Sequence, residues 1–195
     1  MRLENSERSA LLELARGSIA RGLSRGAPQA LPQGEWSARL LAPRAAFVTL
    51  TQCGELRGCC GTIEPQRSLV EEVWRSAWRS AFADPRFPPV AAAEVDSLRA
   101  AISVLTALEP IACASETELI EALVPGVDGL VLRCGAARAT FLPAVWRSLG
   151  EPREFVAQLR RKAGLHGSLW PRAMAAFRYR TETFDDSAGS AALAA

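Results

Sequence analysis

The residues of this chain best suited to chemistry lie together between Leu56 and Thr62. The sequence there is LRGCCGT, which places an arginine, two adjacent cysteines and a threonine around two glycines. A thiolate is a strong nucleophile, and a nearby cation favours its formation. Arg57 stands two positions before Cys59, so the two side chains share a face if the strand is regular. Cys59 is therefore the candidate catalytic nucleophile.

The two glycines of this heptapeptide have two possible explanations. Glycine weakens a strand, because it adds chain entropy and offers no side chain for packing. It is tolerated where something must come close to the backbone. Gly58 and Gly61 therefore indicate either a place where a ligand or another chain meets bare backbone, or a crowded crossing inside the core.

A second polar group lies in the sequence DPRFPP, residues 84–89. Arg86 can hold an anion through its bidentate guanidinium, or it can pair with Asp84 and serve only the fold. The Thr62 hydroxyl can likewise bond a ligand or a turn. The predicted ligand-binding residues are Arg57, Gly58, Gly61, Thr62, Asp84 and Arg86.

Several other kinds of site are not expected. The chain has no CxxC pair, and its only histidine is His166, which argues against a structural zinc site. Adjacent residues of a strand point to opposite faces, so a disulfide between Cys59 and Cys60 would be strained. Walker, dinucleotide-binding and nucleophile-elbow sequences are missing. We therefore predict neither a metal nor a cofactor.

Composition indicates an ordinary globular protein. The chain has 195 residues, 49% of them hydrophobic, and a formal net charge of +2. Lys162 is the only lysine, and the arginines are spread without aromatic interleaving, so we do not expect nucleic-acid binding. The five cysteines, an odd number, and the lack of a signal pattern or a membrane-length apolar run predict a cytoplasmic protein with reduced thiols.

Two long segments are predicted to be helical. Residues 6–24 follow helix spacing from the capping residue Ser6, and residues 69–82 do so after the capping residue Ser68. Trp74 and Trp78 fall on the apolar stripe of the second helix, which we assign to the core. Shorter helices are expected after Ser115, Pro143 and Pro152.

The remaining apolar runs are predicted to be strands. Residues 46–51 and the heptapeptide form a hairpin, residues 101–108 a central strand, residues 130–133 and 138–142 a second hairpin, and residues 175–184 a half-exposed strand. Strands and helices mix without regular βαβ alternation, so the predicted class is α+β. The tail 187–195 is small, polar and alanine-rich, and we expect it to be disordered.

Several of these motifs together resemble the AMMECR domain family. They are residues 56–62 (LRGCCGT), 81–89 (AFADPRFPP), 102–105 (ISVL), 126–129 (GVDG), 141–143 (FLP) and 162–165 (KAGL), in the family's order across residues 6–184. The chain is most similar to members from the prokaryotic AmmeMemoRadiSam system. Cys60 departs from the pattern, since the family usually has an aliphatic residue there.

The resemblance implies one AMMECR-like domain over residues 6–184, with two lobes around antiparallel sheets that share a cleft. It also implies two partners: a Memo-like protein, related to extradiol dioxygenases, and a radical S-adenosylmethionine protein. No biochemical activity is established for the family. The leading hypothesis is thus a ligand- or partner-binding component, which takes a small anion at the heptapeptide. The alternative is a Cys59-dependent enzyme that modifies a small molecule or a partner protein.

Overall fold

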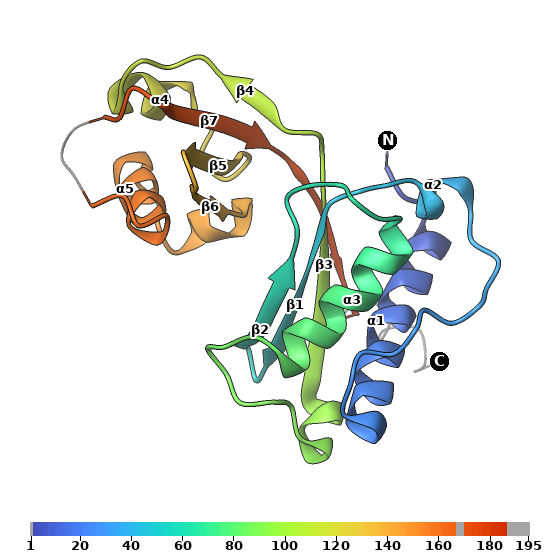
Figure 1. Cartoon of the computed structure of the whole chain (residues 1–195). Coiled ribbons are helices and arrows are strands. Elements are labelled where there is room, and N and C mark those ends of the chain that lie inside the picture. Colours follow the sequence, from blue (N-terminus) through green and yellow to red (C-terminus); the bar gives the residue numbers. More distant parts are fainter. Residues whose placement is uncertain (1, 167–169, 187–195) are drawn as a thin grey trace, which may run out of the picture. The chain divides into compact units, whose positions relative to one another are not determined.

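The computed structural model describes residues 2–166 and 170–186, and it divides the chain into two compact units. The first unit runs to Leu105 and resumes at Glu182, and the second is Thr106–Thr181. Each unit combines a four-stranded antiparallel sheet with helices, so the predicted α+β class is confirmed (Figure 1). The tail 187–195 lies outside the described residues.

The sheet of the first unit contains the predicted hairpin. Its strands, in order, are β2 (Glu55–Gly61), β1 (Ala46–Gln52), β3 (Leu98–Leu105) and β8 (Thr181–Asp185). β1 pairs antiparallel with both of its neighbours. Alternate residues of β1 are buried, among them Val48 and Leu50. The period of two shows that one face of this sheet is covered by other elements.

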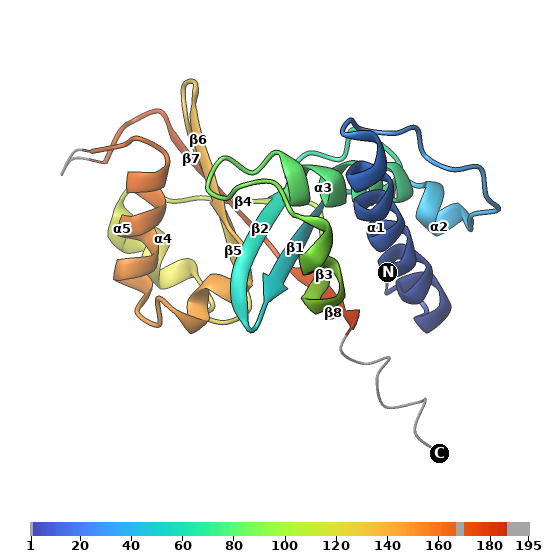
Figure 2. The same ribbon diagram turned by 90° about the horizontal axis from the view of Figure 1, so that it is seen from below.

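Two helices cover that face (Figure 2). They are α1 (Asn5–Arg25) and α3 (Leu69–Phe82). Ser68 caps α3 as predicted, by accepting a hydrogen bond from the Glu71 amide. The predicted cap of α1 is wrong: the capping residue is Glu4, and Ser6 lies inside the helix. Trp74 is buried, as its place on the apolar stripe predicted, whereas Trp78 is only partly buried and lies outside the core cluster. The short helix α2 (Ala38–Leu41) interrupts the connection that we expected to be extended.

Ion pairs fasten the last strand of this unit to its first helix. Glu182 accepts hydrogen bonds from the Arg8 guanidinium and from the Leu3 amide. Asp186, just beyond β8, pairs with Arg16. Residues nearly the whole chain apart in sequence are thereby joined, which closes the unit around its core.

The second unit is built in the same way. Its strands, in order, are β4 (Glu109–Ile111), β7 (Met174–Tyr179), β5 (Gly129–Cys134) and β6 (Ala137–Phe141), accompanied by α4 (Glu116–Ala122), η2 (Pro143–Arg147) and α5 (Pro152–Lys162). Trp146 and Phe155 stack at the centre of its core with their ring centroids 3.7 Å apart. The Trp146 indole N–H donates to the Asp128 carbonyl at 2.7 Å, so this buried ring is fully satisfied.

Two predicted strands differ from the structure. The run 175–184 is divided into β7 and β8, which belong to different sheets, although its alternating pattern continues across the break. The central strand is displaced toward the N-terminus: β3 ends at Leu105, while Glu109 and Pro110 belong to β4 instead of closing it. Proline is tolerated in β4 because this strand lies at the edge of its sheet.

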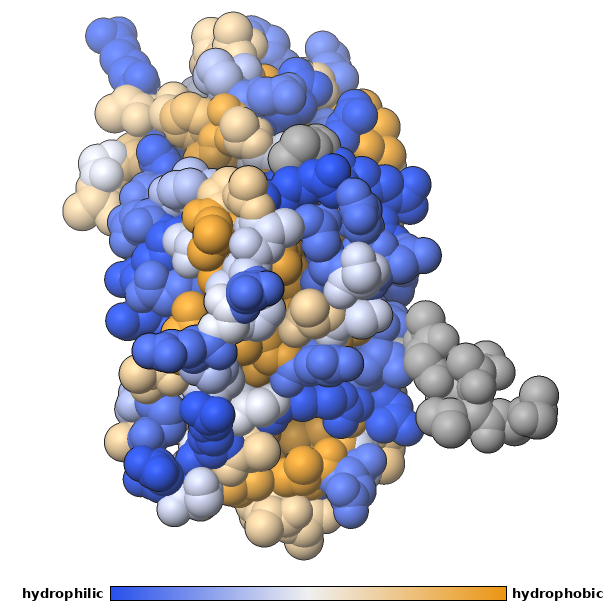
Figure 3. All heavy atoms as spheres, turned by 90° about the vertical axis from the view of Figure 1, so that its right-hand side faces the viewer, coloured by the Kyte–Doolittle hydropathy of each residue, from blue (hydrophilic) through white to orange (hydrophobic). Residues whose placement is uncertain are grey.

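The surface over α1 and α2 is mostly hydrophilic, with apolar residues in separate small groups (Figure 3). Leu41 of α2 is one exposed apolar residue, with 52% of its surface accessible. Among residues 2–166 and 170–186, no helix is both long enough and apolar enough to cross a membrane.

A close contact between α3 and β2 positions the candidate site. At Gly58, a Cβ atom would lie 2.0 Å from the carbonyl oxygen of Ser80. The Ser80 hydroxyl accepts a hydrogen bond from the Cys60 amide and donates one to the Val48 carbonyl, both at 2.8 Å. The glycine therefore lets the helix backbone approach the hairpin closely enough for this bridge to form.

We expect Gly58→Ala to lower the free energy of unfolding by about 3 kcal/mol, because the helix must move away from the hairpin. The matched control is Gly17→Ala in α1, where a Cβ would meet only the Trp74 ring at 3.8 Å. That variant should be neutral, or stabilised by about 0.5–1 kcal/mol through helix propensity. Urea denaturation measures both, and equal values for the two variants would contradict this account of Gly58.

Candidate functional site

β2 is the edge strand of its sheet. At Cys59, the backbone groups on the edge that faces no strand bond to side chains of the same chain. Gly58 and Cys60 pair with Leu50 and Val48 on β1, and the backbone groups of Cys59 point away from that ladder. The Cys59 amide donates to Asp84 Oδ2 at 2.9 Å, and Arg86 Nη2 donates to the Cys59 carbonyl at 3.4 Å. These two side chains thus take the place that a further strand would occupy.

The Asp84 carboxylate is the centre of this cluster, and only 4% of its side chain is exposed. It accepts from Arg86 Nε at 2.9 Å, from Nη2 at 2.6 Å and from the Arg86 amide at 3.1 Å. These bonds favour the charged form, so the pKa of Asp84 lies well below its usual range, with the Arg86 side chain as the largest cause. Asp84 lies two residues beyond the end of α3, and Pro85 then turns the chain so that Arg86 folds back on it.

Arg86 is held firmly on one side and is open on the other. Its side chain is 54% exposed, and its guanidinium lies 5.4 Å from the centre of the Phe87 ring. The hydrogen bond to Asp84 raises the pKa of Arg86 further. Within the described part of the chain, the Nη1 group meets no acceptor, which leaves its N–H donors available to an incoming oxygen.

The Cys59 thiol is half-buried and lies across the sheet from Thr49, with 3.3 Å between Sγ and Oγ1. Threonine is no base near neutral pH, so this contact orients the thiol without activating it. In the same sheet, the hydroxyls of Ser103 on β3 and Thr183 on β8 form a hydrogen bond of 3.0 Å.

Cys60 differs from Cys59 in its surroundings. Its amide donates a hydrogen bond to the Ser80 hydroxyl of α3. Burial raises the pKa of the Cys60 thiol, which therefore stays protonated at neutral pH.

The predicted site residue Arg57 is engaged elsewhere. Its Nε and Nη2 donate to the Glu94 carboxylate at 2.7 and 3.0 Å. Two further bonds go to the carbonyls of Pro88 and Pro89, at 2.9 and 3.4 Å. Arg57 stands where the β1–β2 register shifts, so the regular strand that we assumed is interrupted there. The geometry ties Arg57 to the proline segment, and its role toward a ligand stays a prediction.

The other predicted residues also have partners within the chain. A Cβ at Gly61 would lie 2.3 Å from the Ala46 carbonyl oxygen and 2.5 Å from the Phe47 ring. The Thr62 hydroxyl exchanges hydrogen bonds with the backbone of Glu64, each 3.1 Å long. The bare backbone at both glycines is therefore met by segments of the same chain. Whether a ligand also contacts them remains a prediction.

Sequence reasoning missed Thr49, Ser80 and Glu94, the partners of Cys59, Cys60 and Arg57. All three come from other elements, and no local spacing marks them. The helical period did place Ser80 at the end of α3, but it did not reveal which strand the helix would meet.

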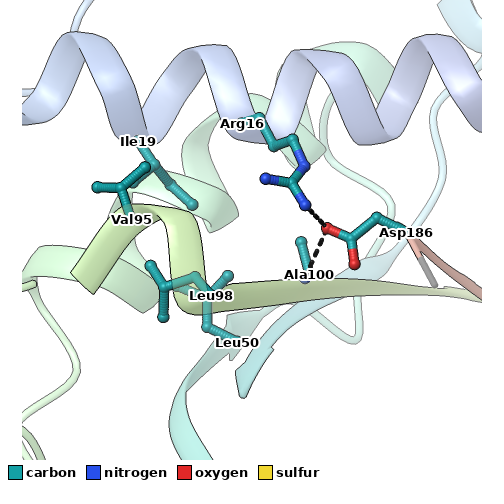
Figure 4. A pocket seen from close by; sticks show the side chains of 7 residues that line it. All are labelled: Arg16, Ile19, Leu50, Val95, Leu98, Ala100 and Asp186. Carbon is teal, nitrogen blue, oxygen red and sulfur yellow. Dashed lines mark hydrogen bonds and ion pairs between the residues drawn. The ribbon is translucent and has the colours of Figure 1, made fainter. Parts of the chain in front are cut away.

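A separate small hollow lies between α1 and the start of β3, and its space of about 290 Å³ is partly open to solvent (Figure 4). Its walls are mostly apolar, with Ile19 and Leu98 among them, and Asp186 closes one end. Asp186 Oδ2 accepts from Arg16 and from the Ala100 amide, whereas its buried Oδ1 meets no partner in the described residues. None of the predicted site residues lines this hollow.

No group of three or more His, Cys, Asp or Glu residues that could hold a metal ion occurs within residues 2–166 and 170–186. The Asp84 carboxylate is already satisfied by Arg86 and the Cys59 amide. The arrangement at β2 therefore suits recognition by directed N–H donors.

Comparison with known proteins gives the family. The model of the AMMECR1 family matches residues 12–184, which is most of the chain. The chain belongs to the AMMECR1 family. Three proteins are among those similar to this AMMECR1-family chain. One from Thermofilum pendens is 33% identical over 94% of this chain and 91% of its own length. Protein MJ0810 from Methanocaldococcus jannaschii is 37% identical over 68% of this chain and 67% of its own length.

The third, from Methanothermobacter thermautotrophicus, is 41% identical, but the match spans only 63% of this chain and 64% of that protein. Among solved structures, the uncharacterized protein PH0010 from Pyrococcus horikoshii superposes with a TM-score of 0.88 at 31% identity, over 96% of this chain and 95% of that one. The resemblance drawn from the motifs is therefore confirmed, as is the fold class.

The ion pair at the β2 edge predicts a pH-dependent stability. The pKa of Asp84 is lowered by folding, so its stabilisation is complete above the pKa of the unfolded chain, ~3.9, and is lost as the pH falls further. Asp84→Asn should therefore reduce the free energy of unfolding by about 2–4 kcal/mol at pH 7. The difference in the free energy of unfolding between Asp84→Asn and the wild type should become smaller below about pH 4.

Urea denaturation from pH 7 to pH 2 measures this difference. The control is Asp96→Asn, an exposed aspartate of η1 (Ala92–Ser97), which should change stability little at any pH. If Asp84→Asn lowers the free energy of unfolding by the same amount at pH 2 and pH 7, the charge of the carboxylate does not contribute to stability.

Proposed function

We propose that this AMMECR1-family protein is a binding component of the AmmeMemoRadiSam system, which acts with a Memo-like protein and a radical S-adenosylmethionine protein. The two partners are inferred from the resemblance of the sequence motifs. In this proposal, the cluster of Cys59, Asp84 and Arg86 contacts a carboxylate or phosphate group. That group belongs either to a partner or to a small ligand held with it.

One observation carries the binding role: Arg86 is fixed in place by Asp84, yet its side chain is 54% exposed and its Nη1 group meets no acceptor among the described residues. An arginine whose rotamer is already restrained loses less entropy when it binds, and its planar donors match a carboxylate or phosphate. Asp84 offsets the charge of Arg86, so the pair selects its target by the direction of the N–H groups more than by net charge.

A second candidate function rests on the half-exposed thiol of Cys59, the residue whose carbonyl accepts a hydrogen bond from Arg86. It is a thiol-dependent modification of a small molecule or of a partner protein. This function requires a reactive thiolate near neutral pH. Alkylation of the native protein that becomes fast only above about pH 8, the behaviour of an ordinary thiol, would exclude it.

A pull-down from the protein's own cells tests the binding role. The tagged protein should recover the Memo-like and radical S-adenosylmethionine proteins, and mass spectrometry should identify them together with any retained small anion. Arg86→Lys should lower the recovery about tenfold, because a lysine cannot hold Asp84 and present planar donors at once.

The control for this experiment is Arg39→Lys, which alters another carboxylate-paired arginine of the same unit. That variant should recover its partners as the wild type does. Equal recovery by Arg86→Lys, with its fold intact, would remove Arg86 from the binding surface. Loss of recovery in Cys59→Ser alone would favour the thiol-dependent alternative.

A further inference from the structure

Residues 84–94 form a segment that passes beside β2 on its way from α3 to η1, and we call it the edge segment (Figures 1 and 2). Two residues of β2 hold it. The Cys59 amide donates to the Asp84 carboxylate at 2.9 Å, at the start of the segment. The Arg57 side chain donates to the Glu94 carboxylate at 2.7 and 3.0 Å, at its end. The edge segment is therefore tied to the same strand at both ends.

The edge segment cannot pair with β2 as an ordinary strand would. Three of its first six residues are prolines, which have no N–H to donate to a ladder. Pro88 and Pro89 still offer carbonyl oxygens, and these acceptors need donors from β2. Arg57 supplies the donors, because its guanidinium bonds the Pro88 carbonyl at 2.9 Å and the Pro89 carbonyl at 3.4 Å. Arginine suits this place, since its five N–H groups can serve two carbonyls and a carboxylate together.

Arg57 has little capacity left for a ligand. Its hydrogen bonds to Glu94, Pro88 and Pro89 all go to the edge segment, and only 11% of its side chain is exposed. Arg86, inside the edge segment, is 54% exposed. Arg86 is therefore the arginine that can meet an incoming anion, whereas Arg57 faces the segment that carries it.

The residues between the two ties are those that the proposed function uses. The Arg86 guanidinium lies 5.4 Å from the centre of the Phe87 ring, and the Phe87 amide donates to the Asp84 carbonyl at 3.2 Å. The next residue, Pro88, is bonded to Arg57. The path of the chain through Arg86 is thus fixed on both sides, by Asp84 before it and by Arg57 after it.

We infer that Arg57 is a positioning residue, which holds the edge segment so that Arg86 keeps the orientation in which it binds. This inference rests on the proposed function, because it takes Arg86 as the residue that contacts the anion. A protein whose binding-competent form is populated only part of the time binds with an affinity reduced by that fraction. Arg57 therefore acts on binding through the edge segment, without contact to the ligand.

A further contact limits the size of this effect. The Val90 amide donates to the Ala81 carbonyl of α3 at 2.9 Å, and the Val90 side chain is buried in the core. Loss of Arg57 should therefore loosen the residues around Arg86 while Val90 stays in place. The expected change is about fivefold, and the measurement must report the order of Arg86 itself.

Exchange of the arginine Nε–H groups with water, followed by NMR on the full chain, reports this order. Arg86 Nε is hydrogen-bonded in the folded chain, and Arg86→Lys assigns its resonance. Arg57→Lys and Glu94→Gln should each speed exchange at Arg86 Nε about fivefold. Exchange at Arg8 Nε, which is hydrogen-bonded in the same unit, should not change. A general loss of stability would speed exchange at both arginines, whereas a loosened edge segment affects Arg86 alone.

The pull-down of the tagged protein measures binding. Arg57→Lys and Glu94→Gln should each lower the recovery of the Memo-like and radical S-adenosylmethionine proteins about fivefold. The double variant should lower it no further, because both changes release the same segment. The control is Arg75→Lys, which alters an arginine paired with Glu71 on α3. This variant should leave the recovery and the exchange at Arg86 unchanged.

Unchanged exchange at Arg86 in both variants overturns the inference. A loss of recovery in Arg57→Lys that Glu94→Gln does not share also overturns it, because Arg57 would then contact the partner directly. In both cases the proposed function stands if Arg86→Lys loses recovery. Full recovery by Arg86→Lys removes the proposed function, and the binding role of Arg57 is removed with it.

Discussion

The candidate site depends on one close contact, the approach of the Ser80 backbone to Gly58. Because no side chain stands at Gly58, α3 lies near enough to the hairpin for the Ser80 hydroxyl to bridge β1 and β2. The end of the helix then falls beside the outer strand, and Asp84, two residues beyond α3, reaches the Cys59 amide. Arg86 is oriented in turn by Asp84. The position of every group in the cluster follows from this contact.

Charged groups at this edge are mostly satisfied by each other. Arg57 pairs with Glu94, and Asp84 pairs with Arg86. The charges of each pair are therefore compensated within the protein in the absence of a ligand. An exposed edge strand invites pairing with other chains, and the Asp84 cluster blocks this at Cys59. The same cluster restrains Arg86 and leaves one face of its guanidinium open. Protection of the edge and readiness to bind therefore come from the same side chains.

The comparison with PH0010 shows how much sequence change the fold tolerates. The two chains superpose with a TM-score of 0.88 at 31% identity, so the fold is kept although most residues differ. Cys60 fits this view. Its burial keeps the thiol protonated, and it packs as a small apolar residue at the position where the resemblance led us to expect an aliphatic one.

The sequence by itself determined the local elements and the family. Periodicity located α1, α3 and both hairpins, and the Ser68 cap marked the start of α3, because each of these signals depends on contacts within a few residues. The sequence motifs were sufficient to identify the family. Only the tertiary structure decided what the site residues do. Local spacing could not show that Arg57 would meet Glu94, or that Ser80 would fill the space at Gly58, since those partners come from other elements. It also could not show that one alternating run, 175–184, would supply strands to two sheets, because the pattern is the same on both sides of the break.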